Sequence, residues 1–221
     1  MTAYFFSFPL HAPLQQTLDD LLAKHARGQY VAPEVSTELA LGTTDGIIQA
    51  MALDVIDILK AGGESAGILD VLARLLKGTM HVLIRQIMGK VTQPEQDKLA
   101  GYLSRRRIVI NSVARFGFSL PEAVGARFDN LLQRITAGHL ENARPELTAL
   151  MSEFVELAVG HFYDDFINSL DLGFVKRKLT EVGRTTVSKG SLTAVHKLFQ
   201  SMTDADLQKV AAHYATMFVK A

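Results

Sequence analysis

Residues 68–88 read ILDVLARLLKGTMHVLIRQIM, and this segment decides the fold class. Its apolar residues recur every three or four positions, at Ile68, Leu72, Leu75, Leu76, Thr79, Val82, Leu83 and Ile87. Charged residues fall between them and project to the opposite side of a helix, at Asp70, Arg74, Lys77, His81 and Arg85. A period of 3.6 residues with one apolar side predicts a long amphipathic helix.

The same spacing recurs along the rest of the chain. The stripes are Val124, Phe128, Leu131, Leu132 and Ile135; Leu147, Met151, Phe154, Val155, Ala158, Phe162 and Phe166; and Leu207, Val210, Ala211, Tyr214, Met217 and Phe218. No window of five or more residues shows the strict alternation of a half-buried strand bounded by turn residues. The best strand candidate, Arg107–Ile110, lies inside a helical pattern.

Residues that start and stop helices agree with these stripes. All six prolines fall at expected helix beginnings, where a missing N–H costs nothing. Capping boxes are predicted at Thr92…Glu95, Ser119…Glu122 and Thr203…Asp206. Glycines follow the periodic segments at Gly28, Gly62–Gly63, Gly89, Gly117, Gly138 and Gly190. The sequence therefore predicts an all-α fold, a multi-helix bundle of eight or nine helices with short loops and no significant β-sheet.

The least regular stretch is Gly183–Ser191 (GRTTVSKGS). Glycine, serine and threonine favour loops, so we place a boundary there. The division predicted is a main helical bundle over residues 1–182 and a C-terminal helical pair over residues 191–221. The alternative is a mobile loop within one single domain.

Composition limits the possible partners. Hydrophobic residues make up 48% of the 221, and the mean hydropathy of +0.15 is high for a soluble chain. The excess must be buried in a thick core, an oligomer interface or a pocket. The 23 basic and 23 acidic residues cancel, so no global field attracts nucleic acid or an anionic membrane, although a local basic stripe remains possible. The basic ladder Arg74, Lys77, His81 and Arg85 is more typical of a solvated face, and we expect no nucleic-acid partner.

Cysteine is absent, which excludes disulfides, thiolate catalysis and Cys-ligated zinc or iron–sulfur clusters. Residues 1–10 lack the basic start of a signal peptide. The most apolar windows carry charges, such as Asp54 and Asp57, and a spanning helix needs about 20 nearly charge-free residues. We therefore expect a cytoplasmic protein with no membrane span.

Three charged residues sit where a charge is costly. Arg106 falls in the middle of an apolar face that runs through Leu99, Tyr102, Leu103, Val109, Ile110 and Val113. Asp54 and Asp165 lie beside other apolar stripes. Because an unpaired buried charge costs several kcal/mol, Arg106 needs a carboxylate partner. Three interpretations remain: a pocket that binds an anionic ligand, a structural ion pair, or an arginine whose charged end reaches water along its apolar stem.

His161 stands next to acidic residues at helical spacing, with Asp164 and Asp165 at i+3 and i+4. These side chains could approach one metal ion. However, the Glu-x-x-His motif of carboxylate-bridged di-iron bundles occurs nowhere in the chain, and no second histidine cluster completes a site. Nucleophile and phosphate-binding motifs are also missing. We predict no catalytic residue, cofactor or metal; His161 stays a candidate with Arg106, Asp54 and Asp165 for a ligand site or buried ion pair.

Three functions fit these observations. The first is a non-catalytic cytoplasmic interaction or regulatory protein that acts as a homodimer, with a further protein as partner. The apolar segment Tyr4–Phe8 (YFFSF) should then pack across an interface or cap the bundle. The second is a helical bundle that binds a hydrophobic or amphipathic small molecule. The third is a helical metalloenzyme that uses His161 and neighbouring acids.

Overall fold

A computed structural model of the protein describes residues 2–60, 65–88 and 91–221. The chain is 75% helical, and the described part contains eight helices when continuous ones are counted once. The mostly helical prediction is confirmed. The prediction that there is no significant sheet is wrong, because four strands form an antiparallel sheet.

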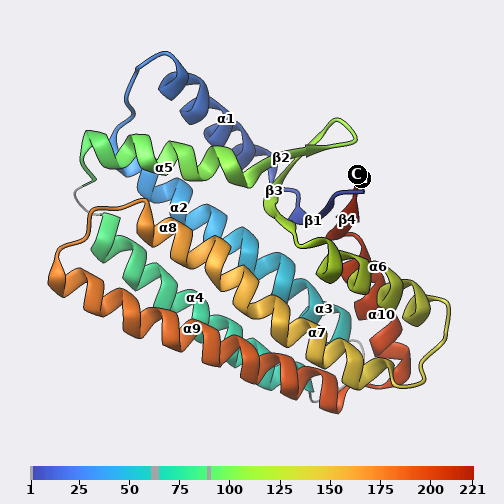
Figure 1. Cartoon of the computed structure of the whole chain (residues 1–221). Coiled ribbons are helices and arrows are strands. Elements are labelled where there is room, and N and C mark those ends of the chain that lie inside the picture. Colours follow the sequence, from blue (N-terminus) through green and yellow to red (C-terminus); the bar gives the residue numbers. More distant parts are fainter. Residues whose placement is uncertain (1, 61–64, 89–90) are drawn as a thin grey trace.

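Four long helices form the body of the molecule (Figure 1). The first joins α2 (Pro33–Ile48), the π-helical segment η1 (Gln49–Leu53) and α3 (Asp54–Lys60), and the second is α4 (Ser65–Met88). The third joins α7 (Ala143–Ala158), the π-helical segment η2 (Val159–Asp164) and α8 (Asp165–Asn168), and the fourth is α9 (Phe174–Ser201). Helix α4 packs against both α2 and α9, and α9 packs against α7, which closes a bundle.

Shorter helices cover this bundle at two places. Helices α1 (Ala12–Ala26) and α5 (Gln93–Arg106) pack on each other beside the start of α2 (Figure 1). Helices α6 (Glu122–Thr136) and α10 (Asp204–Ala215) form a second pair, which contacts α7 and α3. Apolar stripes predicted from the sequence face these contacts: Val124, Phe128, Leu131, Leu132 and Ile135 of α6 are all buried.

The strands are β1 (Tyr4–Phe8), β2 (Arg107–Ile110), β3 (Val113–Leu120) and β4 (Phe218–Lys220), in the order β2-β3-β1-β4. Strands β2 and β3 form a hairpin whose two turn residues, Asn111 and Ser112, have φ values of 51° and 65°. Positive φ at both turn residues matches the right-handed twist of paired strands. Residues 107–110, expected inside a helix, are thus a strand.

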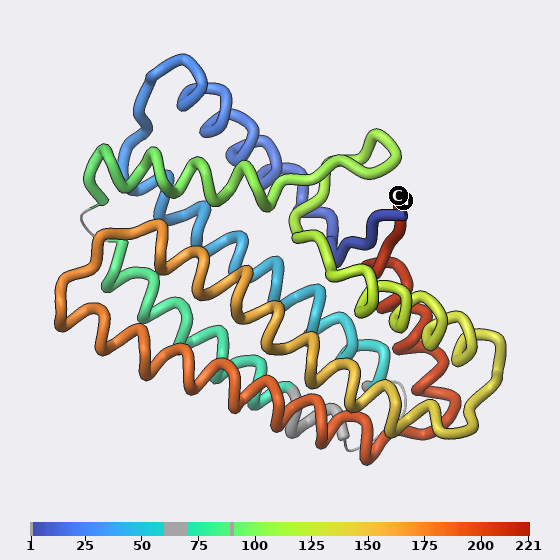
Figure 2. Tube along the Cα trace, viewed as in Figure 1, coloured from blue at the N-terminus to red at the C-terminus, as the bar shows by residue number. Residues whose placement is uncertain are grey.

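The first and last strands lie side by side, so both ends of the described chain meet (Figure 2). Ala3 N donates to Ala221 O at 3.0 Å, and Ala221 N donates to Ala3 O at 2.9 Å. Phe6 stands opposite Phe118 on one side and Phe218 on the other. The Tyr4–Phe8 segment therefore caps the bundle within its own chain.

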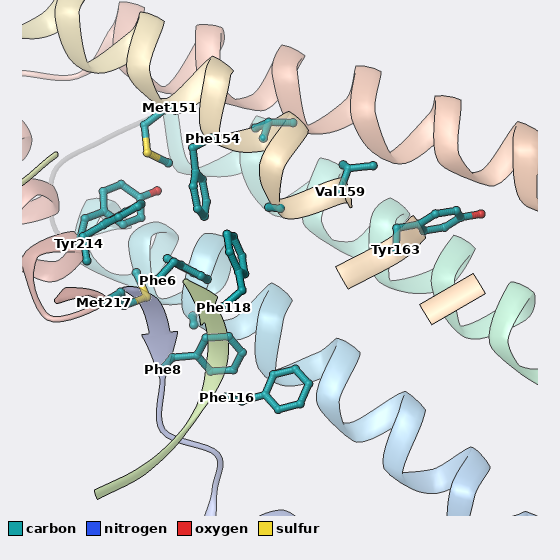
Figure 3. Packing of buried hydrophobic residues seen from close by; sticks show 14 of the residues in the cluster. Phe6, Phe8, Phe116, Phe118, Met151, Phe154, Val159, Tyr163, Tyr214 and Met217 are labelled. Atoms are coloured by element: carbon teal, nitrogen blue, oxygen red, sulfur yellow. The ribbon is translucent and has the colours of Figure 1, made fainter. Parts of the chain in front are cut away.

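Aromatic side chains join the sheet to the helices (Figure 3). The ring of Phe6 lies 4.7 Å from that of Phe154 on α7, and the rings of Phe128 and Phe218 stack at 3.8 Å. Phe118 approaches Phe154 at 6.0 Å. Such pairs contribute about 0.5–1.5 kcal/mol each beyond the area they bury. This cluster fixes the sheet against α6 and α7.

Several predicted boundaries are confirmed and others are wrong. The capping box at Thr92 and Glu95 is present, and Thr203 Oγ1 accepts from Asp206 N at 3.1 Å. Ser119 instead lies in β3, because α6 begins after Pro121. The loop predicted at residues 183–191 is wrong, since α9 runs through it without a break. The division into residues 1–182 and 191–221 stays a prediction, and Gly62–Gly63 and Gly89 lie outside the described residues.

In the described ranges, one continuous helix, Pro33–Leu59, is long and apolar enough to cross a membrane by length and composition. Only 33% of its most apolar window is buried. Residues of this helix, including Ile47, Ile48, Met51 and Ala52, are partly exposed and border a cavity between the helices. Part of the apolar side of this helix thus borders that cavity.

Candidate functional site: an apolar cavity in the bundle

A cavity of about 180 Å³ lies between the four long helices and α10. Its lining residues are almost all apolar: Thr44, Ile47, Ile48, Met51, Ala52, Val55, Leu72, Ala73, Leu76, Met80, Met151, Val155, Ala158, Val159, Phe162, Tyr163, Val187, Ser191, Ala194, Val195, Leu198 and Tyr214. None of these lining residues carries a charge at neutral pH. Four alanines leave space where larger side chains would close the core.

Two π-helical segments border the cavity. Met51 and Ala52 come from η1, and Val159, Phe162 and Tyr163 come from η2. A π segment is a wider turn than an α-helix and is uncommon, and such segments occur frequently at functional sites. The two π-helical segments belong to different helices and line the same cavity. We therefore take this cavity as the candidate functional site.

Side chains from other elements bind carbonyl groups of both π segments. His213 Nε2 donates to Ala50 O at 3.0 Å, and the Tyr214 hydroxyl donates to Met51 O at 3.3 Å. At η2, the Tyr102 hydroxyl donates to Phe162 O at 3.4 Å. A buried carbonyl without a partner is costly, so these donors stabilise the irregular backbone.

The cavity has few polar groups, and they are neutral. The Tyr163 hydroxyl is occupied by Thr180 O at 2.6 Å. Burial raises the pKa of both Tyr163 and Tyr214 far above the usual value of 10.0, so both phenols keep their protons. Thr44 and Ser191 add hydroxyl groups to the wall. The site is suited to an apolar molecule with at most a small polar group.

The structure brings together three of the four residues singled out in the sequence. Arg106 Nη2 pairs with Asp165 Oδ2, and His161 Nδ1 lies 3.4 Å from the same oxygen. The side chain of Arg106 is 6% exposed, whereas that of Asp165 is 40% exposed. The Arg106 guanidinium lies 5.5 Å from the centre of the Tyr102 ring. The group joins the C-terminal end of α5 to η2 and α8.

Asp54 is not part of this group. It begins α3, where Gln49 Nε2 donates to its Oδ1 at 2.6 Å.

Arg106 is absent from the cavity wall, and η2 lies between the cavity and the Arg106–Asp165 pair. Within η2, Phe162 borders the cavity, whereas His161 contacts Phe118 with ring centres 4.3 Å apart. One donor of Arg106, Nε, is buried without a hydrogen-bond partner. The geometry therefore gives Arg106 a carboxylate partner outside the cavity.

The described residues contain no group of three or more His, Asp or Glu side chains placed to hold a metal ion. Asp164, expected near His161 and Asp165, turns away and receives two hydrogen bonds from Arg184 Nε, at 2.9 and 3.0 Å. Its carboxylate therefore belongs to a contact between η2 and α9.

The sequence suggested a bundle that binds a hydrophobic molecule as one alternative, but it did not locate the cavity or its lining residues. Some of its wall residues, such as Leu76, Met151 and Val155, belong to the predicted apolar stripes, and a stripe that fills a core looks the same as one that surrounds a space. The alanines at positions 52, 73, 158 and 194 were the available signal. No protein-family model, curated protein or solved structure matches the chain.

Proposed function

We propose that this protein binds a small apolar molecule in the cavity between its long helices. The observation that carries the proposal is an uncharged cavity of about 180 Å³ bordered by two π-helical segments. An engineered cavity of about 150 Å³ with apolar walls stays free of water and binds benzene. A ligand of that size, or slightly larger, would restore the dispersion contacts that an empty space lacks.

The expected activity is binding, with a regulatory or carrier role in the cytoplasm. The homodimer predicted from composition remains part of this proposal, and so does a protein partner that senses the occupied state. A metalloenzyme built on His161 has less support, because the Asp165 oxygen near it already pairs with Arg106.

Ligand-induced stabilisation tests the proposal with toluene as the probe. A molecule that binds only the folded state raises the free energy of unfolding by about 2.7 kcal/mol at a hundred times its Kd. We expect toluene to raise the unfolding midpoint of the wild-type protein. Ala158→Leu places a larger side chain in the cavity and should remove this response.

Ala149→Leu is the matched control, because Ala149 is exposed on the same helix and is absent from the wall. It should keep the toluene response. An equal response in both variants, or none in the wild type, would reject the cavity as a binding site. Mass spectrometry of an organic extract of the purified protein would then identify any molecule that occupies it.

A further inference from the structure

One outer face of the bundle is unusually apolar. Helices α4 and α9 lie side by side, and their outward surfaces expose Val71, Leu75, Val82, Phe174, Val175, Leu179 and Val182. Phe174 and Val175 are 73% and 79% exposed. Large apolar patches on a surface mark interaction sites.

Four of these residues, Leu75, Val82, Leu179 and Val182, meet in one groove. Val175, Leu179 and Val182 follow each other at intervals of four and three along α9, and a groove between the helices brings Leu179 and Val182 next to Leu75 and Val82. Gly78 opens this groove, since a Cβ added there would meet nothing within 4 Å. We call this surface the α4–α9 face.

Basic residues surround the α4–α9 face. Arg85, Arg177, Lys178 and Lys189 are exposed, and in the part of the chain that the structure describes none of them forms an ion pair. Arg74 is neutralised by Asp70 at 2.5 Å. Glu181 is the acidic residue exposed along α9 near the apolar stripe. The face therefore carries a local positive excess, although the whole chain is neutral.

Several basic residues lie close together in the first turns of α9. Phe174-Val175-Lys176-Arg177-Lys178 opens the helix, and its first turn contains no acidic residue. Lys176 Nζ donates to Ile87 O at 3.2 Å, so the exposed charges are those of Arg177 and Lys178. The N-terminal end of a helix carries a partial positive charge, so basic residues there are unfavourable in the isolated protein. Lys178 Nζ stays over the Phe174 ring, 4.7 Å from its centre. An anionic partner would relieve this repulsion.

We propose that the α4–α9 face docks onto a membrane surface that contains anionic lipids. Exposed aromatic and aliphatic side chains enter the boundary between headgroups and acyl chains, and lysine and arginine bind the negative headgroups. A second copy fits this face less well, because two such faces would bring the unpaired basic residues toward each other. The inference is independent of the cavity and needs no ligand.

Vesicle co-sedimentation tests the proposal with vesicles of phosphatidylcholine alone and of phosphatidylcholine mixed with phosphatidylglycerol. We expect binding to the mixed vesicles, weakened by added salt because screening acts on exposed charges. Phe174→Ser with Val175→Ser should weaken binding by about tenfold or more. Arg85→Gln with Lys178→Gln should weaken it by a similar factor.

Matched controls lie far from the α4–α9 face. Val109→Ser with Val113→Ser removes two exposed apolar side chains from the β2–β3 hairpin, and Lys24→Gln removes an exposed charge from α1. Both should bind vesicles as the wild type does. Circular dichroism would verify that every variant keeps its helical content.

Three results would overturn the proposal. The first is no binding to mixed vesicles, or equal binding to neutral ones. The second is equal weakening by the hairpin control. The third is a dimer in analytical ultracentrifugation that Phe174→Ser with Val175→Ser converts to a monomer, which would assign the face to a second copy.

Discussion

The hydroxyl of Tyr214 donates a hydrogen bond to the carbonyl oxygen of Met51 at 3.3 Å, and both residues border the cavity. Helix α10 thus stabilises the backbone of η1 from a position 163 residues away in sequence. The hydroxyl of Tyr214 binds the carbonyl of a π-helical segment, and Tyr214 also lines the cavity. The stability of the fold and the shape of the cavity therefore depend on the same residue.

Tyr214→Phe should lower the free energy of unfolding by about 1–2 kcal/mol. The substitution removes the hydrogen bond and leaves Met51 O without this donor in a partly buried place. Chemical denaturation measures the loss. Tyr30→Phe is the control, because Tyr30 is exposed, and it should change stability by less than about 0.5 kcal/mol. A change of that small size for Tyr214→Phe would contradict a stabilising role for its hydroxyl.

The pair formed by Arg106 and Asp165 should respond unequally to substitution. Asp165→Asn leaves a buried guanidinium without its carboxylate and should cost about 3 kcal/mol or more. Arg106→Met leaves a carboxylate that water can reach, and should cost about 1 kcal/mol. Urea denaturation of both variants decides the order. The reverse order would mean that Asp165, rather than Arg106, is the residue that needs its partner.

The stability of the protein should fall as the pH drops below about 6.5, partly through His161. Burial, and then the positive charge of Arg106, lowers the pKa of His161 below its ordinary 6.5. The unfolded chain therefore binds this proton at a higher pH than the folded chain, and acid favours unfolding. His161→Gln should reduce the loss of stability between about pH 7.5 and pH 5.5. His139→Gln, at an exposed loop residue, should leave the loss unchanged.

Glu95 should stabilise the protein at neutral pH and lose this effect in acid. Burial raises the pKa of its carboxyl, but hydrogen bonds from Thr92 N, Thr92 Oγ1 and Asp171 N outweigh burial and hold the pKa below 4.5. The stabilisation is present above pH 4.5 and is lost as the pH falls through the lower folded value. Glu95→Gln should cost about 2 kcal/mol at neutral pH.

Denaturation of Glu95→Gln and wild type at several pH values measures this difference, which should shrink in acid. Glu122→Gln, in the exposed first turn of α6, serves as the control and should show a smaller and nearly constant effect. A cost for Glu95→Gln that is independent of pH would show that its charge is not the source.

Gly117→Ala should disrupt the sheet. Gly117 stands opposite Ser7, and an added Cβ would overlap Phe6 O and lie 2.7 Å from Ser7 Cα, both backbone atoms. The strand must shift, so we expect a loss of about 3 kcal/mol, at the upper end for overpacking. Gly78→Ala, where the added methyl group meets nothing within 4 Å, should instead gain up to about 1 kcal/mol from helix propensity. Thermal unfolding compares the two.

Most helices could be predicted from the sequence because prolines, capping residues and the apolar period agreed on where they begin, as at Thr92 and Thr203. Arg106 could also be predicted, since a charge in an apolar face requires a partner whatever the fold. The sheet could not, because β1 is a short aromatic segment, broken only by Ser7, that shows no alternation of apolar and polar residues. Asn111 and Ser112, which form the turn between two short apolar runs, are the residues from which a hairpin could have been predicted.

The cavity and its π segments lay beyond sequence reasoning for another reason. Whether facing stripes fill or surround a space depends on how far apart four helices lie, and no local pattern encodes that distance. The stretch at 183–191 shows a related limit. Its glycines and hydroxyl residues have low helix propensity, yet α9 continues because packing against α4 and α7 outweighs it.

The pairing of β1 with β4 has a consequence for synthesis on the ribosome. Strand β1 emerges before its partners in the sheet, which are residues 113–120 and then residues 218–220. Until those segments follow, Phe6 and Phe8 have no sheet to enter and remain open to chaperones or to other nascent chains. The helical body can assemble during translation, whereas the sheet can be completed only after it.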